Sequence, residues 1–131
     1  MPQTIDLSKT FIHLSDGGNA EPVKVTPMFW RVSGKRYDRL AGIFDFSSAK
    51  DLHSSMQEMH PDADEVLFLL SGAIDVLSEE GGTERTVALE SGQAVIVPRG
   101  VWHRLIMRRP GSLLFINSRK GMQGRPHKPA R

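Results

Sequence analysis

The chain has 131 residues, of which 39% are hydrophobic and 24% charged, a composition typical of a single folded domain rather than a disordered or fibrous protein. It contains no cysteine, which excludes disulfide bonds and a thiolate nucleophile. Because it shows neither a signal-peptide core near its start nor an apolar run long enough to span a membrane, we expect a cytoplasmic protein without a membrane partner.

The positive charge is concentrated in the last thirteen residues, which carry five of the 17 basic side chains and no acidic one. The rest of the chain has 12 basic against 15 acidic residues, so its net charge is near −3. No aromatic residue lies among the terminal charges, which argues against nucleic acid as a partner. We therefore expect residues 118–131 to form a solvated basic tail.

Short strands separated by turns are predicted along most of the chain, in the order 10–14, 28–32, 40–46, 54–60, 65–71, 73–77, 86–89, 94–97, 103–107 and 113–116. Turn signals such as Gly81-Gly82 and Pro98 lie between them. One helical turn is expected near 47–52, and no stretch of twelve residues shows the 3.6-residue apolar period of a longer helix. This pattern predicts an all-β sandwich or barrel.

Two groups of metal-ligand residue types lie at the ends of predicted strands. Glu58 and His60 share one face of their strand because side chains alternate along it. Glu65 begins a strongly apolar strand, where an uncompensated carboxylate would be costly to bury. The tight turn expected at 98–100 places His103 at the head of another strand. In a small barrel these four side chains would point at a single metal ion.

The first group resembles the first signature motif of the cupin superfamily. That motif reads His-x-His, three or four residues, Glu, six residues, Gly. Here the corresponding residues are Glu58-x-His60, four residues, Glu65, six residues and Gly72. The chain departs from the motif at its first histidine, whose place is taken by Glu58.

The second group is similar to the second cupin motif, which reads Gly, five residues, Pro-x-Gly-x-x-His, three residues, Asn. Here Gly92 is followed by five residues, the segment 98–103, three residues and Met107, which stands in place of the asparagine. Nineteen residues separate Gly72 from Gly92, and this spacing suits small one-domain members of the superfamily.

The resemblance implies an all-β fold, the double-stranded jelly-roll barrel of the cupins, over roughly residues 28–117. Residues 1–27 would then be an N-terminal strand arm, and residues 118–131 the basic tail of a single-domain protein. The resemblance also implies one divalent metal ion inside the barrel and a homodimer.

The glutamate at position 58 leaves three interpretations open. In the first, Glu58, His60, Glu65 and His103 ligate the ion together, and this oxygen-rich set suits Fe, Mn, Ni or Zn. In the second, His60, Glu65 and His103 form the two-histidine, one-carboxylate set of non-heme Fe(II) oxygenases, and Glu58 is a catalytic general base beside it. In the third, the site has lost its metal and binds a polar ligand.

Four apolar residues share strand faces with these ligands and are expected to line a cavity: Met56, Leu67, Leu105 and Met107. We therefore expect a metal-dependent enzyme that acts on a small molecule, of dioxygenase-like or isomerase type. A dioxygenase-like reaction is favoured because the second interpretation leaves coordination positions open for O₂ and substrate. The alternative is a non-catalytic cupin that binds or senses a small molecule.

Overall fold

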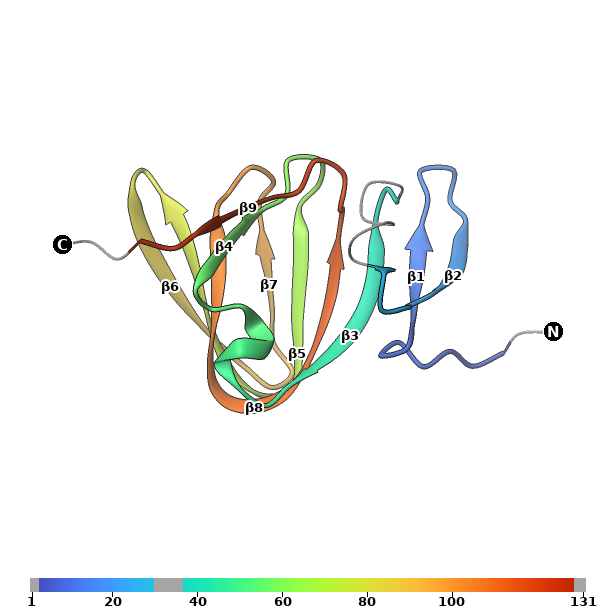
Figure 1. The fold of residues 1–131 in the computed structure, drawn as a ribbon, viewed down its shortest axis with the longest axis horizontal. Helices are drawn as coiled ribbons and strands as arrows, with labels where there is room; N and C mark the ends of the chain where they lie inside the picture. The colour runs from blue at the N-terminus through green and yellow to red at the C-terminus, as the bar shows by residue number, and fades with distance from the viewer. Residues whose placement is uncertain (1–2, 30–36, 129–131) are drawn as a thin grey trace.

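The computed structural model describes residues 3–29 and 37–128 of the chain, and strands make up most of them (Figure 1). The elements in chain order are β1 (Thr10–Leu14), β2 (Ala20–Lys24), β3 (Leu40–Phe46), the 3-10 helix η1 (Ala49–Leu52), β4 (Met56–Met59), β5 (Glu65–Glu80), β6 (Thr83–Glu90), β7 (Ala94–Val97), β8 (His103–Asn117) and β9 (Gln123–Pro126). Within the described residues, no helix has the length and apolar character needed to cross a membrane.

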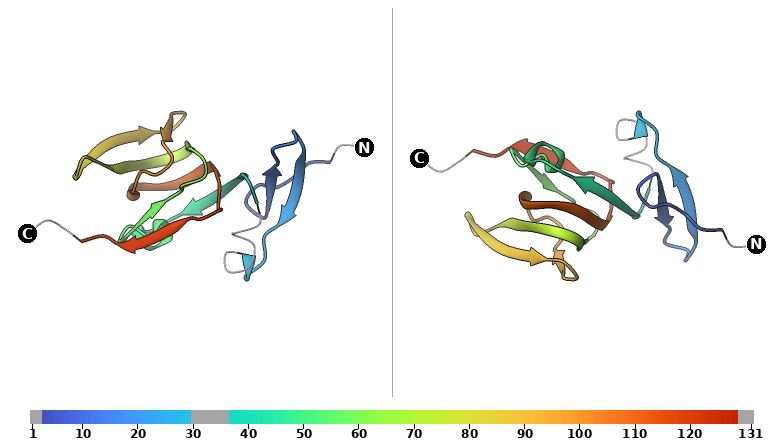
Figure 2. Two further views of the ribbon diagram at one scale, coloured as in Figure 1. Left: turned by 90° about the horizontal axis from the view of Figure 1, so that it is seen from above. Right: turned by 90° about the horizontal axis from the view of Figure 1, so that it is seen from below.

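Two long antiparallel strands, β5 and β8, organise the sheet. β8 pairs with both β3 and β5, and its first residue also pairs with β4. β5 pairs with β7 near its start and with β6 along its second half. The long strands curl into two facing layers, and the hairpin β1–β2 lies beside them (Figure 2). The predicted all-β jelly-roll barrel is thus confirmed.

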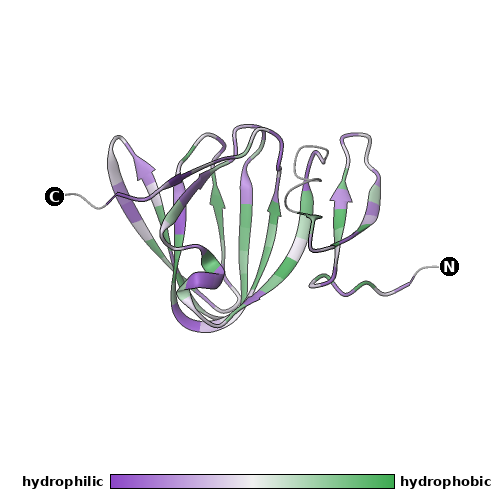
Figure 3. Cartoon of the chain, viewed as in Figure 1, coloured by the Kyte–Doolittle hydropathy of each residue, from purple (hydrophilic) through white to green (hydrophobic). Residues whose placement is uncertain are grey.

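Apolar side chains fill the space between the layers. Leu67 and Leu69 of β5 are buried together with Leu113 and Phe115 of β8. Phe11 of β1 meets the Phe115 ring edge to face, with ring centres 5.1 Å apart. Figure 3 shows the apolar residues concentrated on the barrel strands. Full burial of a Leu or Phe side chain contributes roughly 1.5–3 kcal/mol to stability, so this core holds the barrel together.

Two glycines allow β5 and β8 to approach closely where their pairing register shifts. Gly72 has a φ of +86°, and a Cβ there would lie 2.5 Å from the carbonyl oxygen of Pro110. A Cβ on Gly111 would lie 2.0 Å from the carbonyl oxygen of Ser71. The register shift bends both strands without ending them. This is why each of β5 and β8, predicted as two strands, is a single one.

Most of the other predicted elements are confirmed. The predicted bounds of three strands coincide with those of β1, β3 and β7, and the helical turn expected near 47–52 is η1. The strand predicted at 28–32 falls largely outside the described residues, and residues 27–28 form a turn instead.

The sequence pattern does not predict β2 and β9. Both lie at the ends of the sheet order β2-β1-β3-β8-β4-β9, and each contains a proline, Pro22 and Pro126. Proline has no N–H group for a strand ladder and is therefore favoured at sheet edges. Neither short strand shows the apolar alternation that identifies a strand from sequence.

The C-terminal segment differs from the expected solvated tail. Strand β9 pairs with β4 over four residues. The Arg125 side chain donates a hydrogen bond to Oε1 of Gln57 at 2.8 Å and forms an ion pair with Glu79. Its guanidinium also lies 4.0 Å from the centre of the Trp102 ring. These contacts to residues distant in sequence hold the segment against the barrel.

Candidate metal site and cavity

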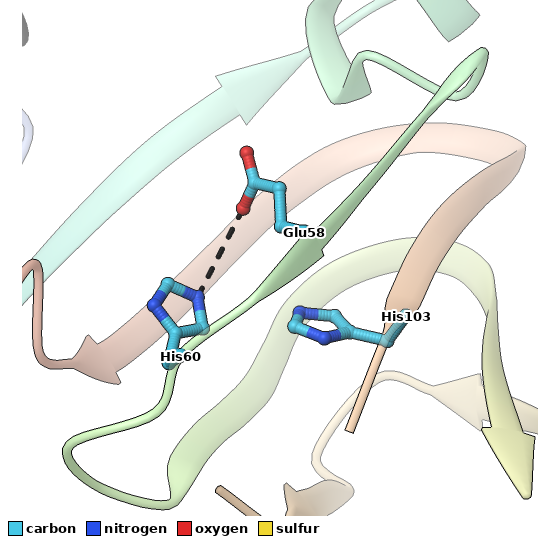
Figure 4. Close-up of side chains that lie close together, drawn as sticks. All are labelled: Glu58, His60 and His103. Atoms are coloured by element: carbon cyan, nitrogen blue, oxygen red, sulfur yellow. Dashed lines mark ion pairs between the residues drawn. The ribbon is translucent and has the colours of Figure 1, made fainter. Parts of the chain in front are cut away.

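The two motif segments meet where β4 pairs with β8. Glu58 on β4 lies directly opposite His103, the first residue of β8. His60 follows the end of β4, and Glu65 is the first residue of β5. Figure 4 shows the Glu58 carboxylate and the two imidazoles close together, with an ion-pair contact between Glu58 and His60. Strand alternation places residues 58 and 60 on the same face.

Backbone carbonyl groups orient both imidazole rings. Nδ1 of His60 donates a hydrogen bond to the carbonyl of Ser118 at 2.9 Å, and Nδ1 of His103 donates to the carbonyl of Val101 at 3.2 Å. Because a carbonyl oxygen only accepts, each Nδ1 carries a proton and each Nε2 atom is left for the site. Both histidines are buried.

The four candidate ligands lie close together. Nε2 of His60 lies 3.9 Å from Oε2 of Glu58 and 3.4 Å from Oε2 of Glu65. Nε2 of His103 lies 2.8 Å from Oε1 of Glu65. One ligand atom from each of Glu58, His60 and His103 lies within 4.8 Å of the other two. Asn117 completes the cluster, because its Nδ2 donates a hydrogen bond to Oε2 of Glu65 at 2.7 Å.

Charge pairing shifts the pKa values of two of these groups. Burial alone would raise the pKa of the Glu65 carboxyl, but the imidazoles of His103 and His60 hold that pKa well below its usual range. Burial alone would lower the pKa of His103, but its hydrogen bond with Glu65 raises that pKa above the usual value. Both shifts favour an ion pair with a proton on Nε2 of His103. A bound cation would take the place of this proton.

The donor set fits a divalent transition-metal ion. Among the described residues, the buried Nε2 atom of His60 has no hydrogen-bond partner, and ligation of a cation would satisfy it. Imidazole and carboxylate groups are the usual ligands of Fe, Mn, Ni and Zn. The Glu58 side chain is 40% exposed and lies close enough to His60 to share an ion with it. The carboxylate at the place of the missing motif histidine is thus positioned to ligate.

A cavity of about 510 Å³ lies beside these residues. Its wall contains seven apolar side chains, namely Phe44, Leu52, Met56, Leu67, Leu105, Phe115 and Met122. Glu58, Glu65 and His103 also line it, together with Asn117. Met107, which the sequence pattern assigns to the cavity, is not among the described lining residues. It lies further along β8, opposite Ile74, and packs against the hydrophobic core.

Comparison with known families decides the classification. A sequence profile described as Cupin domain matches residues 50–117, more than half of the chain. The chain is a member of the cupin family. A comparison with curated protein sequences gives no significant match.

Solved structures share the fold of this cupin at low sequence identity. Hydroxypropylphosphonic acid epoxidase from S. wedmorenis matches with a TM-score of 0.52 and 18% identity over 62% of this chain and 44% of that chain. Recombinant oxalate oxidase in complex with glycolate matches with a TM-score of 0.52 and 18% identity over 66% of this chain and 45% of that chain. A conserved protein of unknown function from Streptococcus pyogenes matches with a TM-score of 0.52 and 19% identity over 64% and 67%. The cupin thus spans less than half the length of the two enzymes, and these likenesses establish the fold.

Sequence reasoning misses three consecutive residues of this cupin that contribute to the site. Asn117 donates to Glu65, the Ser118 carbonyl accepts from His60, and Arg119 lines the cavity. Ser118 contributes a backbone carbonyl, which every residue type has, so its identity carries no signal. Arg119 belongs to the basic segment that composition alone assigns to solvent.

Proposed function

We propose that this cupin is a metal-dependent enzyme that binds one divalent ion, Fe, Mn, Ni or Zn, through Glu58, His60, Glu65 and His103 and acts on a small molecule in the adjacent cavity. The observation that carries the proposal is the pair of buried imidazoles whose Nδ1 atoms are held by backbone carbonyls, so that both Nε2 atoms meet the carboxylates. Burying such groups is costly unless they are paired or bind a metal.

The residues around the proposed ion have separate roles. A bound ion would supply Lewis-acid or redox chemistry to the substrate. Glu65 would keep its position because Asn117 holds one of its oxygens. Glu58 is partly exposed and lines the cavity, so its carboxylate is the group placed to accept a proton from the substrate. The apolar wall beside it would exclude water from the reacting end of the substrate.

We favour a dioxygenase-like reaction over isomerisation. His60, Glu65 and His103 have the composition of the two-histidine, one-carboxylate set of non-heme Fe(II) oxygenases. Solved structures with a similar fold include an Fe(II)-loaded epoxidase and an oxalate oxidase. The oxidative activities named for those two proteins agree with the proposal.

Metal analysis tests the ligand set directly. Untagged protein purified without chelator should contain close to one ion per chain, whereas His60→Ala and His103→Ala should bind at least about tenfold more weakly. His53→Asn is a matched control, because His53 lines the same cavity outside the ligand cluster and its φ of 50° suits asparagine. Wild-type protein that holds almost no metal, even after reconstitution with each ion, would contradict the proposal.

A second experiment separates the two roles of Glu58. Protein loaded anaerobically with Fe(II) should consume O₂ with at least one member of a panel of acids, thiols and diketones. A Glu58→Gln variant that keeps its ion but turns over about 100-fold more slowly identifies a general base. A variant that loses the ion identifies a ligand. No O₂ uptake with any compound would count against dioxygenase-like chemistry.

One observation favours a second candidate, a non-catalytic cupin that binds a small molecule. Both oxygens of Glu65 already have partners, His103 and Asn117, so this buried carboxylate is satisfied without an ion. In that case the protein would bind small molecules with the same affinity before and after treatment with a chelator. A binding affinity that depends on the ion would exclude this candidate.

We also propose a homodimer. Two large apolar side chains on the paired strands β5 and β7 are exposed, Leu70 by 38% and Ile96 by 63%. Ile96 lies opposite Val66, on the strand face that Leu70 shares, and exposed apolar groups on one face are typical of an interaction surface when they form a continuous patch. Sedimentation should therefore show a dimer at micromolar concentration and a monomer for Ile96→Lys. A wild-type monomer would contradict the proposal.

A further inference from the structure

Three basic side chains line the cavity, and their surroundings differ. Arg104 donates to both carboxylate oxygens of Glu84, at 2.9 and 3.1 Å. Lys50 lies on η1 and is exposed to solvent. Arg119 is partly buried, and this burial lowers the pKa of its guanidinium although the two site carboxylates act to raise it. Arg119 therefore carries its charge in a partly desolvated position beside the site.

The backbone around Arg119 is tied to the candidate ligands. The two residues before it are the partners of Glu65 and His60, Asn117 through its side chain and Ser118 through its carbonyl. Strand β8 ends at Asn117, and the chain turns there toward β9. The Cupin domain profile also ends at residue 117, so the family match assigns no role to Arg119.

The charge balance of the cavity favours an anion. The two site carboxylates would neutralise a bound divalent ion, and Arg119 adds one positive charge. Two further acids at the cavity, Asp45 and Asp51, are exposed and accept hydrogen bonds from Ser112 and Ser47, so solvent screens them. With a divalent ion bound, the formal charge of the interior beside the apolar wall would be that of the Arg119 guanidinium.

We propose that Arg119 binds the carboxylate of the substrate, which is a small organic monoanion with an apolar body. The planar guanidinium matches a carboxylate through two parallel hydrogen bonds. The apolar walls of the 510 Å³ cavity, including Phe44, Leu105 and Phe115, would hold the rest of the molecule. A monoanion would balance the single positive charge of Arg119, whereas a phosphate dianion would leave an excess of one negative charge. This inference deepens the proposed function and rests on it.

Calorimetric titration with probes of the same shape tests the inference. Metal-loaded wild-type protein should bind benzoate about tenfold more tightly than benzamide, because a hydrogen-bonded charge pair is lost in the amide. Phenyl phosphate should bind no better than benzoate. Arg119→Gln should bind the acid and the amide equally. Arg119→Lys keeps the charge without the planar fork and should lose part of the preference.

The control substitution removes a positive charge from the same cavity. Lys50→Gln should change the ratio of the benzoate and benzamide affinities less than about twofold, because solvent screens Lys50. Elemental analysis and thermal melting should show that Arg119→Gln remains folded and keeps its ion. Equal binding of both probes by wild-type protein, or a full preference for benzoate in folded Arg119→Gln, would overturn the inference.

The same titration separates this inference from the proposed function. Absence of metal from every wild-type preparation would overturn the proposal that this cupin is a metal-dependent enzyme. The assignment of Arg119 would then be judged on metal-free protein by the same pair of probes. It stands if Arg119→Gln abolishes a preference for benzoate, and falls if the wild-type protein has no such preference.

Discussion

The two ends of the chain each add a strand to an edge of the same sheet, but they serve it differently. The N-terminal hairpin joins the sheet where β1 pairs with β3, and it lies beside the barrel (Figure 2). Its Phe11 is buried in the core. The C-terminal strand β9 pairs with β4, so that Gly124 lies opposite Glu58. The segment before it brings Ser118 and Arg119 to the candidate site.

This difference shows that the pairing partner of an edge strand decides what the strand contributes. β2 and β9 have five and four residues, both are polar and contain a proline, and neither carries a chemical signal of its own. β9 supports the candidate site because it pairs with β4, which carries Glu58. The comparison therefore predicts that damage to the C-terminal segment affects metal binding, whereas damage to the hairpin affects stability.

The largest effect on metal binding is expected from deletion of residues 118–131. His60 would lose the carbonyl that holds its Nδ1, and β4 would lose its four-residue pairing with β9. Loss of an outer partner of a ligand typically weakens metal binding about 10- to 100-fold. Elemental analysis of the reconstituted, folded protein should show this loss. A truncated protein with full metal occupancy would break the comparison.

The matching change in the hairpin is Phe11→Ala. It removes a ring that packs against Phe29 and Phe115, with ring centres 5.4 and 5.1 Å away, and should cost about 3–5 kcal/mol of unfolding free energy. Urea denaturation measures this loss. At low temperature the folded variant should keep wild-type metal stoichiometry, and a selective loss of metal would contradict our view of the hairpin.

A smaller effect is expected for Arg125→Ala. The change removes the contacts of Arg125 with Gln57, Glu79 and the Trp102 ring, which together contribute about 1 kcal/mol. Arg85→Ala is the control, because its ion pair with Glu80 is on the surface and should leave the denaturation midpoint unchanged. Equal midpoints for the two variants would show that β9 is not clamped by Arg125.

The smallest predicted effect concerns the pH dependence of the metal-free protein. Because folding lowers the pKa of Glu65, this group stabilises the fold at pH values above its ordinary pKa of 4.5. That stabilisation is lost as the pH falls through the lowered pKa. Because folding raises the pKa of His103, this group stabilises the fold at pH values below its ordinary pKa of 6.5. That stabilisation is lost as the pH rises through the raised pKa. Stability of the pair should therefore be greatest between pH 4.5 and 6.5. In Glu65→Gln the urea denaturation midpoint should depend less on pH, both within this pH range and above it.

Much of the fold and of the candidate cluster could be predicted from local patterns. Alternation placed Glu58 and His60 on one face, and the two motif spacings brought them near His103 and Glu65, as the structure shows. Their role as metal ligands stays a prediction. The pairing of β9 with β4 has no local pattern, because its hydrogen bonds come from backbone groups that every sequence shares.

The sequence by itself determined the strand periodicity, the motif spacing and the replacement of the first motif histidine by Glu58, and these suffice for the cupin barrel. Only the tertiary structure decided that the segment after Asn117 returns to β4 and brings Arg119 into the cavity. The physical reason is that hydrophobic alternation is encoded residue by residue, whereas the packing of a charged terminal segment against the barrel depends on partners distant in the chain. Arg125 illustrates this. Its charge predicts a side chain fully exposed to solvent, but its contacts with Glu79 and Trp102 hold it against the barrel.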